Sequence, residues 1–177
     1  MKSEHILNKN WGISLIPIDT IPNIELYVDQ VTTFMEKRLS SYKRYEDEKI
    51  LTKTMINNYA KAKLFPSPVK KKYSANHIML LILIYHLKNV LTISDISKLL
   101  APINTMLEED SDCPSLEELY GAFTDIQQAM ADNKPYTLDE GSHNPLIYNI
   151  LSVLSLALKS SYERRCAEYI IDTEFNA

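Results

Sequence analysis

The stretch that decides the fold is LTKTMINNYAKAKLFPSPVKKKYS, residues 51–74. Thr52 suits the N-cap of a short helix over residues 53–63, because its hydroxyl can accept a hydrogen bond from the first helical turn. At helical spacing, apolar and polar residues separate onto two sides of this helix. The side predicted to be buried holds Ile56, Tyr59, Ala60 and Leu64, and the exposed side holds Lys53, Thr54, Asn57, Asn58 and Lys61.

Two prolines end this helix, because neither Pro66 nor Pro68 can continue it. Residues 69–73 are predicted to be short and extended, and they carry three lysines directly before a tyrosine. Ser74 then suits the N-cap of the next helix. The stretch therefore predicts a polar-faced helix followed by a small basic β-flap.

Helices are predicted on both sides of this stretch. Upstream, an amphipathic helix follows a poorly patterned, proline-containing arm that we expect to lie extended over apolar surface. Directly downstream comes a long apolar helix, and then a short one closed by Pro102. Ser115 and Glu118 form a capping box for a further helix, and Pro145 suits the first turn of the last. The expected elements are the arm 1–26 and helices 28–39, 75–91, 93–100, 115–132 and 145–175.

Composition supports an all-α protein. The 177 residues include only three glycines, and 45% are hydrophobic, which favours helices over a turn-rich β fold. The longest apolar run, residues 78–85, falls well short of the about 20 residues that cross a membrane, so a buried helix is the expected reading. The N-terminus lacks the apolar core of a signal peptide, and we therefore expect a cytoplasmic protein with reduced cysteines.

Charge is divided unevenly along the chain. Eleven Lys or Arg residues lie between Lys37 and Lys72 against three acidic residues, a net charge of +8 in a chain whose total is -4. Between Ala101 and Glu140, ten acidic residues face only Lys134. This division suggests a basic face for a polyanion and an acidic body away from it. Two solvated faces of opposite sign, meeting across a dimer contact, are the alternative.

The order of elements from residue 51 to residue 100 resembles the MerR family of winged-helix regulators. In that family the pattern runs Thr-Ile-Arg-Tyr-Tyr-Glu, Gly-Leu-Leu-Pro, and then a wing with Arg-x-Tyr. On this match the family's isoleucine, second tyrosine, leucine, proline and wing tyrosine correspond to Ile56, Tyr59, Leu64, Pro66 and Tyr73. Its recognition-helix arginine, first tyrosine and glycine are replaced by Asn57, Asn58 and Lys63. The whole chain also resembles an uncharacterised family of Gram-positive bacteria, the domain of unknown function 1836.

The resemblance implies a winged helix-turn-helix fold with a small basic wing, plus C-terminal helices. The expected organisation is an extended arm (1–26), a MerR-like winged-helix domain (27–102) and a C-terminal helical region packed on it (103–177). A transcriptional regulator that binds double-stranded DNA follows, with Asn57 and Asn58 reading bases and the lysines meeting phosphates. The candidate DNA-contacting residues are Lys53, Thr54, Asn57, Asn58, Lys61, Lys70, Lys71, Lys72 and Tyr73.

Nothing in the sequence predicts catalysis, a cofactor or a metal site. The four histidines are scattered, and no zinc, phosphate-loop or nucleophile-elbow motif occurs. Arg164 and Arg165 are expected to lower the pKa of Cys166, which leaves a redox role with Cys113 as a minor alternative. A protein-interaction adaptor without DNA binding and, more weakly, a small-molecule sensor with a pocket between the C-terminal helices and the core are the competing functions. The effector stays unknown, and a homodimer through the last helix stays open, because the apolar first half of that helix equally suits internal core.

Overall fold

The computed structural model describes residues 13–109, 114–141 and 143–175. The described chain is mostly helical, with one two-stranded sheet, which confirms the all-α class. The elements in order are η1 Ile18–Thr20, β1 Leu26–Tyr27, α2 Val28–Leu39, η2 Ser40–Tyr42, α3 Lys53–Lys61, β2 Lys72–Tyr73, α4 Ala75–Leu87, α5 Ile93–Glu109, α6 Pro114–Ala131 and α7 Pro145–Glu174.

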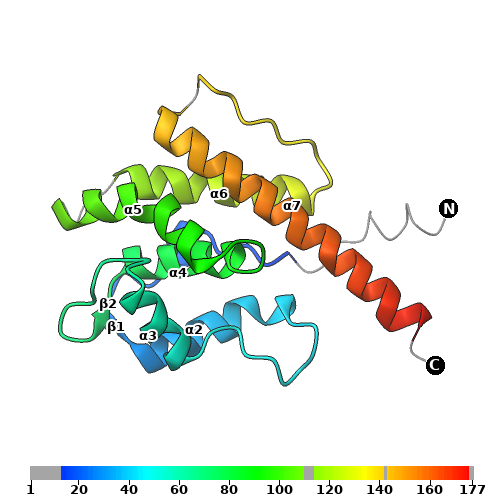
Figure 1. Cartoon of the computed structure of the whole chain (residues 1–177), viewed down its shortest axis with the longest axis horizontal. Helices are drawn as coiled ribbons and strands as arrows, with labels where there is room; N and C mark the ends of the chain where they lie inside the picture. Colours follow the sequence, from blue (N-terminus) through cyan, green and yellow to red (C-terminus); the bar gives the residue numbers. More distant parts are fainter. Residues whose placement is uncertain (1–12, 110–113, 142, 176–177) are drawn as a thin grey trace.

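α4 is the centre of the molecule. Every residue from Ile78 to Leu87 is buried, because α6 and α7 pack on one side of α4 while α2 and α3 lie on the other (Figure 1). The expectation of a helix buried all round is therefore confirmed. Within the described ranges, no helix combines the length and the apolarity needed to cross a membrane.

The small sheet joins the start of the chain to the predicted flap. β1 pairs with β2 in antiparallel register, with Leu26 opposite Tyr73 and Tyr27 opposite Lys72. Val69 also bridges Lys72, whose backbone N–H donates to the Val69 carbonyl at 2.9 Å. Residues 69–73 are thus a tight turn and a strand rather than wholly extended.

The turn at the flap's tip has an uncommon backbone. Lys70 and Lys71 both have positive φ, at 50° and 64°, as the two central residues of a type I′ hairpin turn do. This conformation favours Asn-Gly over two lysines, because a Cβ crowds the backbone there. The sequence contains no glycine at this point, so the turn type could not be predicted from it.

α3 has the predicted start and an earlier end. The Thr52 hydroxyl accepts a hydrogen bond from the Met55 N–H at 3.1 Å, which confirms the N-cap. The helix stops at Lys61 instead of residue 63, because Lys63 adopts φ of 55° and the Leu64 N–H donates to the Tyr59 carbonyl at 3.0 Å. A left-handed residue just past a helix, satisfying a late carbonyl in this way, is a common C-terminal stop.

Three other predicted boundaries were wrong. α4 ends at Leu87 rather than residue 91, and α6 begins at Pro114, so Ser115 lies inside the helix instead of capping it. α5 does not close at Pro102 but continues to Glu109 with the proline inside it. The apolar stripe explains this continuation: Leu100 and Ile103 are both fully buried on either side of Pro102, and tertiary burial outweighs local helix propensity.

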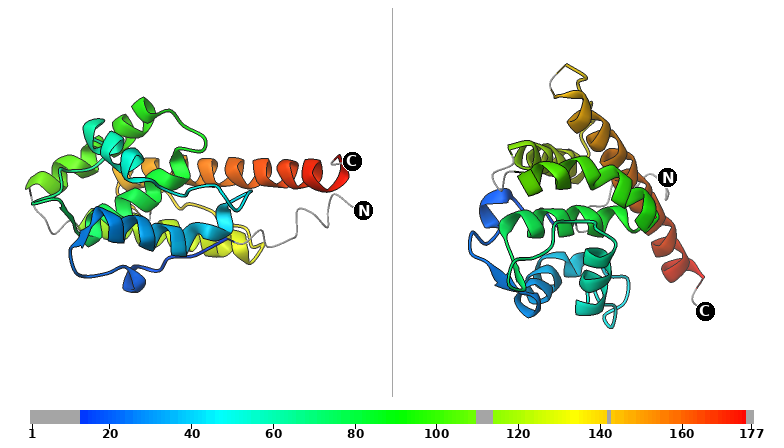
Figure 2. Two further views of the ribbon diagram at one scale, coloured as in Figure 1. Left: turned by 90° about the horizontal axis from the view of Figure 1, so that it is seen from below. Right: turned by 60° about the vertical axis from the view of Figure 1, so that its left-hand side comes forward.

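The N-terminal arm and α7 cover the core from two directions. The described part of the arm includes a fully buried Ile16, whose carbonyl accepts a hydrogen bond from the Tyr120 hydroxyl at 2.8 Å; residues 1–12 lie outside the described residues. The first half of α7 is buried, which confirms the internal-core reading of Ile147, Leu151 and Leu154. Its C-terminal half runs out past α4 (Figure 2).

Candidate nucleic-acid interface

The outer face of α3 carries most of the predicted DNA contacts. Ile56 and Tyr59 are buried and fix the helix on the core, so helical spacing turns the polar residues to solvent. Lys53, Thr54, Asn57, Asn58 and Lys61 are all exposed. The structure therefore brings these five residues together on one accessible surface.

The flap adds two further lysines to this side of the molecule. Lys70 and Lys71 are exposed at the tip of the hairpin, beside Val69, which is 67% exposed. α2 contacts both α3 and β2, so the helix and the flap share one support. We call the exposed face of α3 and the hairpin tip together the basic face.

Two of the predicted lysines already have acidic partners. Lys53 forms an ion pair with Asp29 at the start of α2. The Lys72 ammonium lies 3.3 Å from a Glu25 carboxylate oxygen and 5.9 Å from the centroid of the Tyr27 ring. Both acids belong to the N-terminal part of the chain, not to its acidic C-terminal half.

Three lysines of the basic face lack such partners. Lys61, Lys70 and Lys71 form no ion pair with any described residue. Unpaired lysines on an accessible face leave a positive potential for a polyanion. They are therefore the stronger candidates for phosphate contacts, and Lys53 and Lys72 are weaker ones.

Tyr73 is not part of this surface. It is only 4% exposed, and its ring lies edge-on to the rings of Phe65 and His77, with centroids 6.2 Å and 5.6 Å away. Burial raises the pKa of its phenol. We therefore withdraw Tyr73 from the predicted DNA contacts: its role is to anchor β2 on the core.

His77 fixes the base of the flap. Its Nδ1 accepts a hydrogen bond from the Ser74 N–H at 3.1 Å, and its Nε2–H donates to the Pro66 carbonyl at 3.0 Å. These bonds tie the beginning of the flap to the beginning of α4. Burial lowers the pKa of His77, so the neutral ring needed for this pairing is present at physiological pH.

α5 holds the end of α3. The Asn104 side-chain amide donates to the Lys63 carbonyl at 3.2 Å, and the Ser97 hydroxyl donates to the Ala62 carbonyl at 3.4 Å. Lys63 is exposed next to the basic face, and it was not among the DNA contacts predicted from the sequence. Its position as the last residue of the predicted helix 53–63 was the available signal.

The structure does not support the redox role considered for Cys166. Cys166 is buried, and burial raises the pKa of its thiol, with Arg165 opposing as a smaller effect; the expected lowering was wrong. Cys113 lies outside the described residues. No cluster of metal-ligating side chains occurs in the part of the chain that the structure describes.

The basic face and the residues behind it fall within a recognised sequence family. A family model described as a domain of unknown function (DUF1836) matches residues 16–123. These residues include β1, α2, α3, the flap and α4. No curated protein sequence and no solved structure matches the chain.

Proposed function

This chain belongs to the family described as a domain of unknown function (DUF1836), and we propose that it binds double-stranded DNA through the basic face, as a transcriptional regulator. α3 enters the major groove, which is wide enough for one helix. Lys61, Lys70 and Lys71 meet phosphates on either side of that groove. Asn57 and Asn58 are the base-reading residues, because an asparagine amide pairs with the N6 and N7 positions of adenine.

The observation that carries the proposal is the backbone at the flap's tip. Lys70 and Lys71 have φ of 50° and 64°, a conformation that costs an ordinary L-residue roughly 1–2 kcal/mol. Asparagine and glycine would occupy it with less strain. Two exposed lysines held at a strained turn indicate that their charge has a use, and strain of this kind concentrates at functional sites.

The MerR resemblance gives independent support for a winged helix. The position matched to the family's glycine is Lys63, whose φ is 55°, a conformation that glycine adopts without strain. The position matched to the wing tyrosine is Tyr73, which anchors the flap. The differences at Asn57 and Asn58 lie on the exposed face of α3 and bear on which bases are read, not on how the helix is supported.

The test is binding to random-sequence duplex DNA over a range of salt concentrations. Lys61, Lys70 and Lys71 each contact a phosphate in this proposal, and Lys53 contacts a fourth when it gives up its ion pair with Asp29. The logarithm of the DNA-binding constant should therefore fall against log[salt] with a slope of about -3 to -4. Lys70→Gln with Lys71→Gln should make that slope less steep by about 1.8. No binding by the unmodified chain at low salt would refute the proposal.

A matched control separates contact from net charge. Lys134→Gln with Lys159→Gln removes the same two charges from exposed positions after α6 and on α7. We expect this control to bind duplex DNA like the unmodified chain. If the two double variants lose affinity equally, net charge rather than the basic face governs binding, and an adaptor function becomes the better reading.

A further inference from the structure

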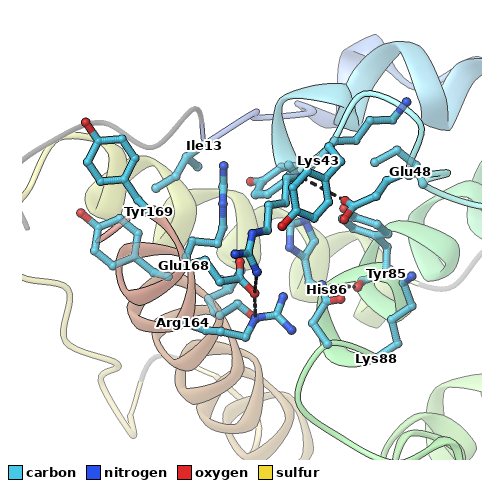
Figure 3. A pocket seen from close by; sticks show the side chains of 18 of the residues that line it. Ile13, Lys43, Glu48, Tyr85, His86, Lys88, Arg164, Glu168 and Tyr169 are labelled. Atoms are coloured by element: carbon cyan, nitrogen blue, oxygen red, sulfur yellow. Dashed lines mark hydrogen bonds and ion pairs between the residues drawn. The ribbon is translucent and has the colours of Figure 1, made fainter. Parts of the chain in front are cut away.

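A cavity of about 540 Å³ lies beside residues 42–50, the segment of chain that leads into α3. Residues 42–50, the C-terminal end of α4, α6 and the second half of α7 line it. Figure 3 shows Tyr85, His86 and Lys88 facing Arg164 and Glu168 across this space. The volume lies in the range of small-molecule sites, about 300–1,000 Å³. None of the residues proposed to contact DNA lines it.

Three rings form an uncharged aromatic wall. Tyr42, Tyr85 and His86 pack edge-to-face, with centroids between 5.1 Å and 6.0 Å apart. Burial lowers the pKa of His86 to about 3, so the imidazole is neutral at physiological pH. Such rings present apolar faces to a flat ligand.

Two phenol groups on this wall retain hydrogen-bonding capacity. The Tyr42 oxygen accepts hydrogen bonds from the Ser14 N–H at 3.2 Å and the Gln127 amide at 3.3 Å, and its own O–H has no acceptor among the described residues. The Tyr85 hydroxyl likewise has no hydrogen-bond partner within the described ranges. Two donors at the wall favour a ligand that carries an acceptor group.

Basic residues outnumber acidic ones around the cavity. Arg44 donates two hydrogen bonds to Asp172, at 3.0 Å and 2.7 Å, and Glu168 lies 3.7 Å from both Arg44 and Arg164. These contacts occupy Asp172 and Glu168. The basic residues are Lys43, Arg44, Lys49, Lys88, Arg164 and Arg165, and the acidic residues are Glu48, Glu168 and Asp172.

Lys88 and Arg165 are left without a carboxylate partner among the described residues. The Lys88 ammonium lies 5.0 Å from the Tyr85 ring centroid, and the Arg165 guanidinium lies 5.1 Å from that of Tyr42. Burial and, to a lesser degree, the charge of Arg164 lower the pKa of Lys88, and the carboxylate of Glu48 opposes them as the smallest effect. The C-terminal dipole of α4 offsets part of the Lys88 charge, and Arg165 donates one hydrogen bond to the Ser41 carbonyl at 3.0 Å.

We propose that this cavity binds a small aromatic carboxylate, with its ring against Tyr42 and Tyr85 and its carboxylate held by Lys88 and Arg165. The two cations lie over neighbouring rings whose centroids are 6.0 Å apart. The uncharged wall excludes a ligand that is charged along its whole length.

The cavity is also linked to the basic face, a point that rests on the proposed DNA binding. Residues 42–50 form one wall, and Thr52, two positions further on, caps α3. A ligand that shifts this segment therefore changes the position of the α3 N-terminus. Linkage then requires that the ligand and DNA change each other's affinity by the same factor.

The test uses 1-naphthoate and its neutral amide, 1-naphthamide, with the full chain. Calorimetric titration should give saturable 1:1 binding of the naphthoate, and binding of the amide at least tenfold weaker, because only the carboxylate engages the two cations. Inorganic phosphate at equal concentration should not compete, since it has no ring. Equal affinity for acid and amide, or no saturation by the naphthoate, overturns the proposal.

Variants locate the site. Arg165→Gln and Lys88→Gln should each weaken naphthoate binding by about tenfold and leave amide binding unchanged, a selectivity that misfolding cannot produce. Lys159→Gln, an exposed position on α7 outside the cavity, should bind naphthoate like the unmodified chain. If Lys159→Gln loses as much as the other two variants, the anion binds elsewhere and the cavity assignment fails.

A last experiment measures the affinity of the chain for duplex DNA with and without saturating naphthoate. A change in DNA affinity that disappears in Arg165→Gln supports the link to α3, and an unchanged affinity refutes the link while leaving the cavity assignment intact. If the chain binds no DNA at low salt, the proposed function fails separately, because naphthoate binding is measured without DNA.

Discussion

Replacing the two lysines of the flap with the residues that the turn prefers should stabilise the protein and weaken DNA binding together. Lys70→Asn with Lys71→Gly removes two strained left-handed residues at roughly 1–2 kcal/mol each. The glycine lowers this gain by roughly 0.5–1 kcal/mol, because it increases the conformational entropy of the unfolded chain. The hydrogen bond from Lys72 to Val69, at 2.9 Å, is kept. The expected gain in unfolding free energy is therefore about 1–3 kcal/mol.

Urea unfolding and duplex binding measure the two effects separately. A gain of about 1 kcal/mol raises the melting temperature by roughly 2–4 °C in a chain of this size. Losing two phosphate contacts makes the salt slope less steep by about 1.8. Lys70→Gln with Lys71→Gln is the matched control: it should lose the same DNA slope without gaining stability, since its backbone strain remains.

Two results would refute this reasoning, and they are distinguishable. If the asparagine–glycine variant is no more stable than the unmodified chain, the turn is not strained and the observation that carries the proposed function is lost. If stability rises but the salt slope does not change, the turn has the predicted backbone and the flap does not contact phosphates. DNA would then have to meet another surface.

Three further predictions follow from named contacts. Asn57→Ala should weaken binding to a selected DNA site by roughly 1–3 kcal/mol and leave random-sequence binding nearly unchanged; equal losses in a gel-shift titration would make Asn57 a backbone contact. His86 has a pKa of about 3 in the folded protein, below its value of about 6.5 in the unfolded chain. The unfolded chain therefore takes up the proton first as the pH falls. The free energy of unfolding should drop by about 1.4 kcal/mol from this residue between pH 7.5 and pH 5.5. His86→Gln should reduce that loss in urea unfolding at the two pH values, and an equal loss in both proteins would contradict the buried neutral imidazole. Arg44→Gln removes the hydrogen bonds to Asp172 and should speed amide exchange of residues 43–50 in mass spectrometry, with no change at α4; protection unchanged across that segment would show that Arg44 does not hold it.

Helix positions could be predicted from the sequence wherever apolar spacing and caps agreed. α3 began at its Thr52 cap, and α7 had almost its predicted bounds, because an apolar stripe and Pro145 marked it locally. Pro102 misled the prediction. Its effect on local backbone is real, but the stripe through Leu100 and Ile103 continues across it, and only the packed structure shows that this burial decides.

The exposed side of α3 was also predictable, because periodicity alone separates Ile56 from Asn57. The burial of Tyr73 was not predictable, because a single residue at the end of a short strand has no periodicity that shows which face it occupies. Likewise, Lys53 and Lys72 had no sequence signal for their acidic partners: Asp29 and Glu25 come from distant positions brought close by packing.

A pocket between the C-terminal helices and the core was predicted as the weakest alternative, but the residues that form the cavity could not be predicted, for a related reason. The two cations without a carboxylate partner among the described residues, Lys88 and Arg165, lie 77 positions apart in the sequence, and each taken alone is typical of a solvated helix surface. Their significance depends on which carboxylates are already engaged. Asp172 and Glu168 are occupied by Arg44 and Arg164, a distribution that sequence charge counts do not contain.

α3 is held in two different ways at its two ends, and this determines what a ligand could do to it. Its C-terminal end is bonded to α5 through Asn104 and Ser97, far along the chain from the cavity wall. Its N-terminal end follows the segment that lines the cavity. A ligand that displaces that segment should therefore pivot the helix about its C-terminal end. Contacts near Lys53 and Asn57 would move further than those of Lys61, so base reading should be more sensitive to the ligand than phosphate binding.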